Sequence, residues 1–215
     1  MKKIWLTGVS IISMLNISNS MASEIKPFIG GNLAWNAITW ANDLNKLKNV
    51  GVNLPDSFLG VGVEIGAKLK TSGIYNPGIT LAYDYTFDSA ADVKYPANGI
   101  WQDIKTGFSA FSGTFDNYIR LSGDESKRAD FVFGVGLASI TERVKTTVTS
   151  YAIGLGEEDY SDKDSGTFAV LKVGVSAQIS DNVDWYTNGR VFLPTKSDGD
   201  VSALFNLNTG LRFVF

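Results

Sequence analysis

The chain has 215 residues, of which 19 are basic and 22 acidic, and its formal net charge is −3. This acidic balance argues against nucleic acid as a partner. The absence of cysteine excludes a disulfide framework and a cysteine for lipid attachment, and the length makes one domain the default expectation.

The N-terminus has the pattern of a secretory signal peptide. Two lysines precede an apolar run over 4–15, and Ser20 and Ala22 are small residues at the two positions that a signal peptidase reads. The run is too short for a membrane-spanning helix. We expect a signal peptide over 1–22, cleaved after Ala22, followed by one domain over 23–215. Removing two of the 19 lysines and arginines leaves 17 basic against 22 acidic residues, a net charge of −5.

Apolar and polar residues alternate in eight later segments, each about as long as a tilted strand that crosses a bilayer. Their odd-numbered positions carry no charged residue, whereas the even-numbered positions carry five acids and five bases. An exported chain that spans a membrane without a helix must do so as a closed sheet. The segments are 28–37, 58–70, 78–87, 110–121, 131–142, 167–179, 183–193 and 205–215. The ten charges are Glu64, Lys68, Asp84, Asp116, Arg120, Glu142, Lys172, Asp184, Arg190 and Arg212.

Alternation alone would also fit a soluble domain with an apolar core. Three features favour an odd-numbered face that points outward to lipid. The even-numbered face is rich in glycine, which suits the narrow interior of an eight-stranded barrel. The segments are about twice the usual strand length, and aromatic residues gather near their ends, as membrane-interface girdles require. Those aromatic residues are Trp35, Tyr85, Phe87, Phe111, Phe131, Trp185, Phe213 and Phe215.

The connections between segments alternate between long and short. Transmembrane barrels have short periplasmic turns and long extracellular loops, so both termini should be periplasmic and the loops 38–57, 88–108 and 143–165 should be extracellular. The sequence therefore predicts an all-β fold, an eight-stranded antiparallel up-and-down transmembrane β-barrel. The fourth segment, 110–121, is the least regular, because Gly113 and Asn117 interrupt its apolar face.

The last segment ends in a recognisable pattern. Asn208, Gly210, Phe213 and Phe215 resemble the C-terminal sorting signal of bacterial outer-membrane barrels, which implies recognition by the barrel-assembly machinery. The chain as a whole resembles the small eight-stranded outer-membrane barrels, namely the OmpA-type transmembrane domain and the opacity-like and porin-family surface proteins of Gram-negative bacteria. This resemblance implies residence in the cell outer membrane, contact with its lipid, and loops exposed at the cell surface to a host or surface ligand.

The interior charges allow two readings. In a barrel this narrow they should pair with one another, because an unpaired buried charge carries a desolvation penalty of several kcal/mol. Alternatively, Asp84, Asp116, Lys172 and Arg190 could line a path for ions or solutes. With no histidine and no cysteine, the usual general base and the usual strong nucleophile are missing. We therefore expect no enzyme, no cofactor and no metal.

The loops leave further alternatives open. The acidic residues of 157–164 could bind calcium or simply be solvated. Leu44, Leu47 and Val50 could form amphipathic turns that cap the barrel or bind an apolar ligand, or they could pack as an ordinary loop. Tyr95, Pro96 and Trp101 could recognise a partner or pack on other loops. The expected function is a non-enzymatic surface protein that combines envelope structure with surface contact. The alternative is a narrow pore, or an OmpW-like channel for small or hydrophobic solutes.

Overall fold

The computed structural model describes residues 24–40, 51–71, 73–93, 100–122, 128–150, 157–195 and 201–215. The expected signal peptide, 1–22, lies outside these residues, and its cleavage after Ala22 stays a prediction. Within the described part of the chain, no helix is both long enough and apolar enough to cross a membrane. Nearly all of the described residues belong to β-strands.

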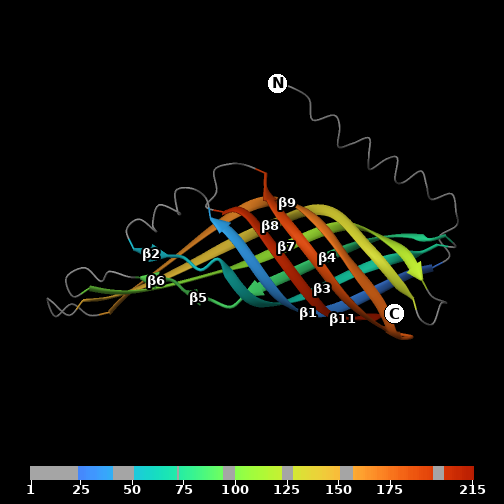
Figure 1. Cartoon of the computed structure of the whole chain (residues 1–215), viewed down its shortest axis with the longest axis horizontal. Helices are drawn as coiled ribbons and strands as arrows, with labels where there is room; N and C mark the ends of the chain where they lie inside the picture. Colours follow the sequence, from blue (N-terminus) through green and yellow to red (C-terminus); the bar gives the residue numbers. More distant parts are fainter. Residues whose placement is uncertain are drawn as a thin grey trace, which may run out of the picture.

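Eight long antiparallel strands form one closed sheet (Figure 1). Neighbours in the sheet follow the order β4-β3-β1-β11-β10-β9-β8-β7, and pairing of β4 with β7 closes the ring. The first and last strands, β1 and β11, lie side by side over 28–40 and 201–214. The predicted eight-stranded antiparallel barrel is confirmed. The strands are β1 (Glu24–Trp40), β3 (Ser57–Lys70), β4 (Tyr75–Thr86), β7 (Ile100–Ser122), β8 (Ala129–Ser150), β9 (Glu157–Ser180), β10 (Val183–Pro194) and β11 (Val201–Val214).

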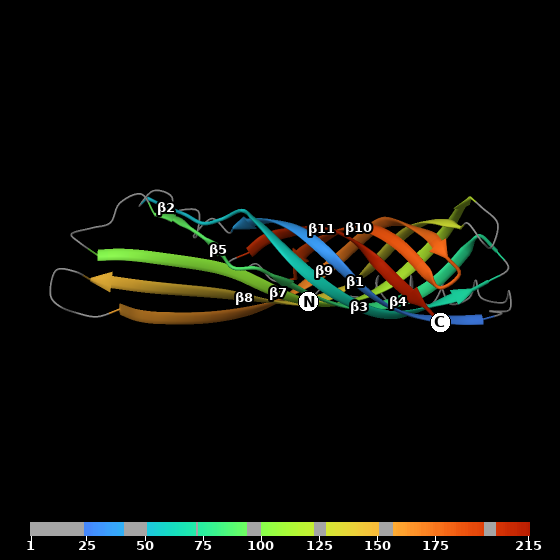
Figure 2. The same cartoon turned by 90° about the horizontal axis from the view of Figure 1, so that it is seen from below.

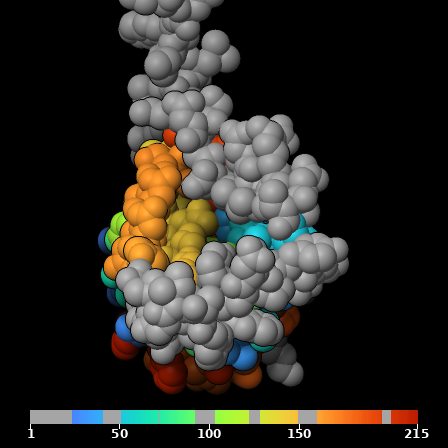
Figure 3. All heavy atoms as spheres, turned by 90° about the vertical axis from the view of Figure 1, so that its left-hand side faces the viewer, coloured from blue at the N-terminus to red at the C-terminus, as the bar shows by residue number. Residues whose placement is uncertain are grey.

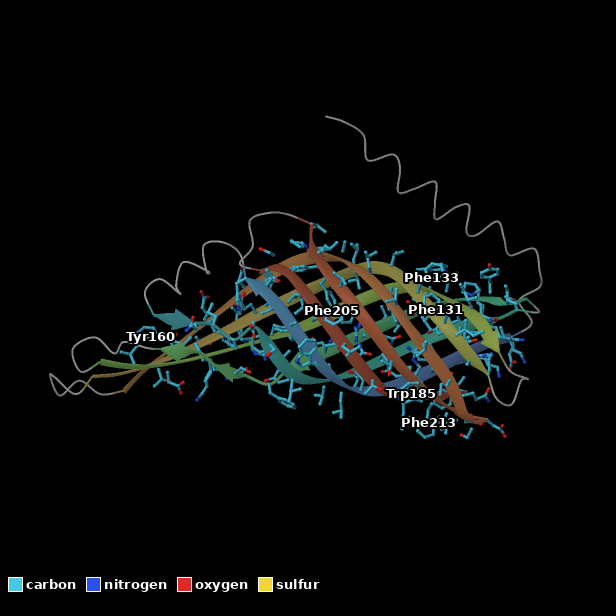
Figure 4. All side chains as sticks on the ribbon, viewed as in Figure 1. Phe131, Phe133, Tyr160, Trp185, Phe205 and Phe213 are labelled. Carbon is cyan, nitrogen blue, oxygen red and sulfur yellow. The ribbon has the colours of Figure 1, made fainter. Side chains whose placement is uncertain are left out.

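Within the barrel, the strands present odd-numbered residues outward and even-numbered residues to the interior, except at the start of β11, where Val201 is buried. On β1 and β11, Leu33 and Leu211 are 68% and 49% exposed, whereas Asp116 on β7 and Val132 on β8 are fully buried. Such exposure of large apolar side chains would be costly in water, so hydrocarbon is the medium that suits this surface. Figure 4 shows Phe131, Trp185 and Phe213 near the end of the barrel at which the chain ends, on the outer surface, as an interface girdle requires.

The two ends of the barrel differ. At one, here called the turn end, the connections 71–74, 123–128 and 181–182 are short, and β1 begins and β11 ends there. At the opposite end, the loop end, three minor strands accompany the connections: β2 (Val52–Asn53), β5 (Ser89–Ala90) and β6 (Asp92–Val93). Strand β2 pairs with β6 and β5 pairs with β7, so the first two loop-end connections contact each other through backbone hydrogen bonds.

The prediction of long loops over 88–108 and 143–165 is wrong for 100–108 and for most of 143–165. Strand β7 begins at Ile100, β8 continues to Ser150 and β9 begins at Glu157, so these three strands project beyond the rest of the barrel (Figure 2). The strands were predicted from segments whose odd-numbered, outward face is uncharged. Arg143 and Lys145 are odd-numbered and charged, so this part of β8 was not predicted as a strand. A strand that has left the hydrocarbon region no longer has to satisfy that criterion, because water or polar partners can solvate its charges.

Candidate functional site

The middle of the lumen is filled by buried ion pairs that join strands across the barrel. Arg190 of β10 donates two hydrogen bonds to Asp84 of β4, from Nη1 to Oδ2 at 2.8 Å and from Nη2 to Oδ1 at 3.1 Å. Lys172 of β9 donates from Nζ to Asp116 Oδ2 of β7 at 2.8 Å. All four residues are at most 3% exposed. The residues that could have lined an ion path therefore neutralise one another.

A third buried ion pair lies in the lumen beside the last strand, β11. Arg212 of β11 donates from Nε to the Glu64 carboxylate of β3, and both side chains are 2% exposed. Aromatic rings surround the guanidinium, whose central carbon lies 4.2 Å from the ring centre of Tyr186 and 4.7 Å from that of Phe28. Cation–π attraction of this kind is strongest where the cation is desolvated, so the rings and the carboxylate together hold a buried charge beside the last strand.

The remaining predicted charges lie towards the two ends. Lys68 is buried and donates to Asp130, whose Oδ2 also lies 3.0 Å from Arg128 Nε in a second ion pair. Asp130 was outside the predicted segment, although its even number and the even-face pattern place it in the lumen. Arg120 and Asp184 line a cavity at the turn end, and Glu142 is buried near the loop end.

A layer of apolar side chains, here called the apolar layer, closes the lumen at the loop end. The alternating pattern does not predict this layer, because the even-numbered face was interpreted as polar along its whole length. Within the layer, the rings of Phe58 and Phe108 meet edge to face with centroids 5.4 Å apart. Trp40 satisfies its indole N–H by donating to Pro55 O at 2.9 Å. The twelve members are Ile38, Trp40, Phe58, Phe108, Ala110, Ala138, Ile140, Phe168, Val170, Phe192, Val201 and Leu204.

The register shows that the apolar layer spans the barrel. Ile38 of β1 lies opposite Leu204 of β11, and Phe192 of β10 lies opposite both Leu204 and Val170 of β9. Strand β4 contributes a polar exception, Thr86, whose hydroxyl is fixed by both the N–H and the C=O of Phe108. The apolar side chains of this layer offer no hydrogen-bonding partner to a hydrated ion.

The projecting parts of β7, β8 and β9 form a three-stranded sheet, here called the projecting sheet. Among the described residues, β10 pairs with β9 only from Phe168 onward, so no described strand lies beside β9 on that side over 157–166. We call this side the open edge. Figure 3 views the loop end and shows orange β9 beside ochre β8. Tyr160, labelled in Figure 4, is 58% exposed on the projecting part of β9.

Two aspartates occupy two of the hydrogen-bond donors of the open edge. Thr167 O accepts from Thr195 N on the β10 side, and alternate residues of a strand face the same side, so the amides of Lys163 and Ser165 point to the open edge. Asp162 Oδ1 accepts from Lys163 N and Asp164 Oδ1 accepts from Ser165 N, both at 2.8 Å. Free edges are prone to pair with other chains, and charged side chains are a common protection.

Several predicted loop features lie outside the described residues. These are the amphipathic turns of Leu44, Leu47 and Val50, the pair Tyr95 and Pro96, and the side chains of Trp101 and of 157–159. Among the described residues, no group of three or more potential metal ligands comes together.

The proposed sorting residues lie along β11 and at Phe215, the residue that follows it. Asn208 is buried in the lumen, Gly210 lies against Asn32 of β1, and Phe213 and Phe215 are exposed on the outer face. Their role in sorting stays a prediction.

Structures of several small barrels resemble this one. Ail, the attachment invasion locus protein of Yersinia pestis, solved with the heparin analogue sucrose octasulfate, matches with a TM-score of 0.50 and 14% identity, covering 89% of this chain and 99% of that one. Neisserial surface protein A matches with a TM-score of 0.47 and 15% identity, covering 88% and 97%. The outer membrane enzyme PagL matches with a TM-score of 0.48 and 9% identity, covering 86% and 98%.

No protein-family model matches the sequence, and no curated protein sequence does. The likeness to solved structures, at these identities, concerns the fold. With its closed ring of eight strands, apolar outer face and ion-paired lumen, the chain has the fold of the small eight-stranded outer-membrane β-barrels.

Proposed function

We propose that this protein is a non-enzymatic outer-membrane surface protein that binds partners through the open edge of its projecting sheet. The observation that carries the proposal is the extension of β7, β8 and β9 beyond the barrel, where no strand in the described part of the chain pairs with one side of β9 over 157–166. An unpaired edge can accept an extended segment of another chain as an added strand. The sequence has neither histidine nor cysteine, which supports a role without catalysis.

The charges of the open edge favour a basic partner segment. Asp162 and Asp164 are exposed, and the adjoining residues Glu157, Glu158 and Asp159 are also acidic in the sequence. When a partner strand adds, its carbonyl groups would take the edge amides of Lys163 and Ser165. Its lysine or arginine side chains would then take the two released carboxylates. A second copy of the chain would instead bring like charges together, which opposes self-pairing.

The apolar layer argues against the alternative role as a pore. It lies between the ion-paired lumen and the loop end, and its members come from strands all around the ring. The predicted ion path along Asp84, Asp116, Lys172 and Arg190 would have to cross it after losing its charges to pairing. Surface contact is therefore the function that the geometry supports best.

The test compares two substitutions at one edge residue. Lys163→Pro removes the amide donor from the open edge, whereas Lys163→Ala removes the same charge but keeps the donor. Each protein, refolded in maltoside micelles, is titrated against a fluorescent peptide of alternating arginine and threonine, and binding is followed by anisotropy. We expect saturable binding to the wild type and to Lys163→Ala, and none to Lys163→Pro. Equal binding by the two variants would show that the open edge is not the contact.

A further inference from the structure

The turn-end mouth of the barrel holds a polar cavity of about 300 Å³, at the opposite end from the projecting sheet. Its lining comes from six of the eight strands and two of the connections between them, so the closed fold itself builds the cavity. The lining residues are Lys26, Lys70, Arg120, Arg128, Gln178, Asp181, Asp184 and Val214.

Cations outnumber acids in this lining by four to two. Part of the positive charge is already matched, because Arg128 Nε lies 3.0 Å from Asp130 and Lys26 Nζ lies 3.7 Å from Glu24. Arg120 differs from these. Its Nε atom is buried without a hydrogen-bond partner among the described residues, while its backbone N–H is fixed to Ile74 O at 2.8 Å.

The residue types define the chemistry of a ligand. A guanidinium presents its donors as a planar fork that matches the oxygens of a phosphate, and ammonium groups add charge without directional demand. Leaving a buried guanidinium N–H unsatisfied costs free energy, which an anion oxygen in the cavity would recover. The excess of positive charge would repel a metal cation. An apolar ligand would have to remove water from the charged side chains without replacing their hydrogen bonds, which costs free energy.

We propose that the turn-end mouth is a binding site for a phosphate group, with Arg120 as its principal donor and Lys70 and Lys26 as supporting charges. The group arrives either on a soluble molecule or on the headgroup of a lipid beside the mouth. Asp181 and Asp184 of the same lining select against more extended anions, because they would repel a second negative group placed near them.

The experiment titrates inorganic phosphate into the full chain refolded in uncharged maltoside micelles, with ionic strength held constant by chloride. The readout is the backbone amide NMR shift of Arg120, Gln178 and Val214. We expect saturable shifts at these residues with a dissociation constant in the roughly millimolar range, as suits a small solvent-accessible anion. Shifts that chloride reproduces, or that centre on the loop end, would overturn the proposal.

Two variants and one control assign the site. Arg120→Gln should weaken binding roughly ten-fold, because a charge-assisted donor is lost. Lys70→Gln should weaken phosphate binding less. This second variant tests the site if Arg120→Gln does not fold into a barrel. Lys163→Gln removes the same charge at the loop end and should titrate like the wild type. Unchanged affinity in the folded mouth variants would refute the assignment.

A second arm separates the two sources of phosphate. The protein in nanodiscs of phosphatidylcholine is compared with the protein in nanodiscs that contain phosphatidic acid, using the same three amide signals. Shifts in the micelle titration would show that free phosphate suffices. Shifts only with phosphatidic acid would assign the site to a lipid headgroup, and no response in either arm would refute the site.

Discussion

The stability contribution of the buried pair of Asp116 and Lys172 measures how far water is excluded from the lumen. Asp116 is fully buried, Lys172 is 3% exposed, and Thr80 Oγ1 also donates to the same carboxylate oxygen, at 2.5 Å. Replacing Asp116 by Asn keeps the volume but leaves the lysine charge unpaired. Removing one partner of a buried pair costs about 3–5 kcal/mol. We expect Asp116→Asn, and likewise Lys172→Met, to lower the free energy of unfolding by that amount.

The double variant completes the test. Because Asp116→Asn with Lys172→Met leaves no uncompensated charge, its unfolding free energy should fall within about 1–2 kcal/mol of the wild type, well short of the sum of the two single losses. Urea unfolding of the barrel refolded into lipid vesicles, followed by tryptophan fluorescence, measures all four proteins. Single variants that each cost under about 1 kcal/mol would mean that water reaches the pair, and the view of the lumen as a packed polar core would then fail.

Four further predictions concern other parts of the fold. Phe58→Ala should cost about 3–5 kcal/mol in the same unfolding assay, because it opens a cavity in the apolar layer, whereas lipid-facing Leu59→Ala should cost less. Gly210→Ala should prevent folding of the barrel, since a Cβ there would collide with Gly31 O, so the faster-migrating band of the folded protein should be lost from a gel of the unheated sample. Gly31→Ala, whose added Cβ would lie 3.9 Å from the nearest atom, should keep that band. A hydrogen bond from Lys145, helped by Arg143, lowers the pKa of Asp88, so its stabilising contribution is complete above the ordinary aspartate value and is lost as the pH falls through the lower folded-state value. Thermal unfolding should accordingly separate wild type from Asp88→Asn at neutral pH, and the two should converge in strong acid. Deleting Phe215 should deplete the protein from isolated outer membranes; unchanged yield of the heat-modifiable form would contradict the sorting prediction.

The transmembrane strands could be predicted because a single constraint acts along each of them. Hydrocarbon on one side and a narrow lumen on the other force an uncharged odd face and a small or polar even face. That constraint places β10 within one residue of its observed end at Pro194 and gives its start at Val183. The partnership of Arg190 with Asp84 does not follow from it, because those residues are 106 positions apart and meet only when the ring closes.

The alternation of apolar and polar residues predicted neither the apolar layer nor the projecting sheet, and the two failures have opposite causes. Phe58, Phe168 and Phe192 are even-numbered and apolar, so they break the polar-inside rule while remaining inside. Arg143 and Lys145 are odd-numbered and charged, so they break the apolar-outside rule while remaining in strand β8. Only the projecting sheet has left the depth at which alternation carries information, whereas the apolar layer lies within strands whose outer face still alternates. Runs of β-branched residues such as Val144, Thr146 and Thr147 were the available signal for the longer strand.

The open edge of β9 also fixes how far from the bilayer a partner would be held. The ten residues of this edge, 157–166, which pair with β8 but with no described strand on the other side, extend about 33 Å at roughly 3.3 Å per residue. A tilt of about 45° would still leave on the order of 23 Å of height. The headgroup zone on each side of a bilayer is only about 5–8 Å deep, by the difference between the full and the hydrocarbon thickness. A ligand bound along this edge would therefore be held clear of the headgroups by hydrogen-bonded backbone of constant length. Strand geometry, and not loop motion, would set the distance between the cell and its partner.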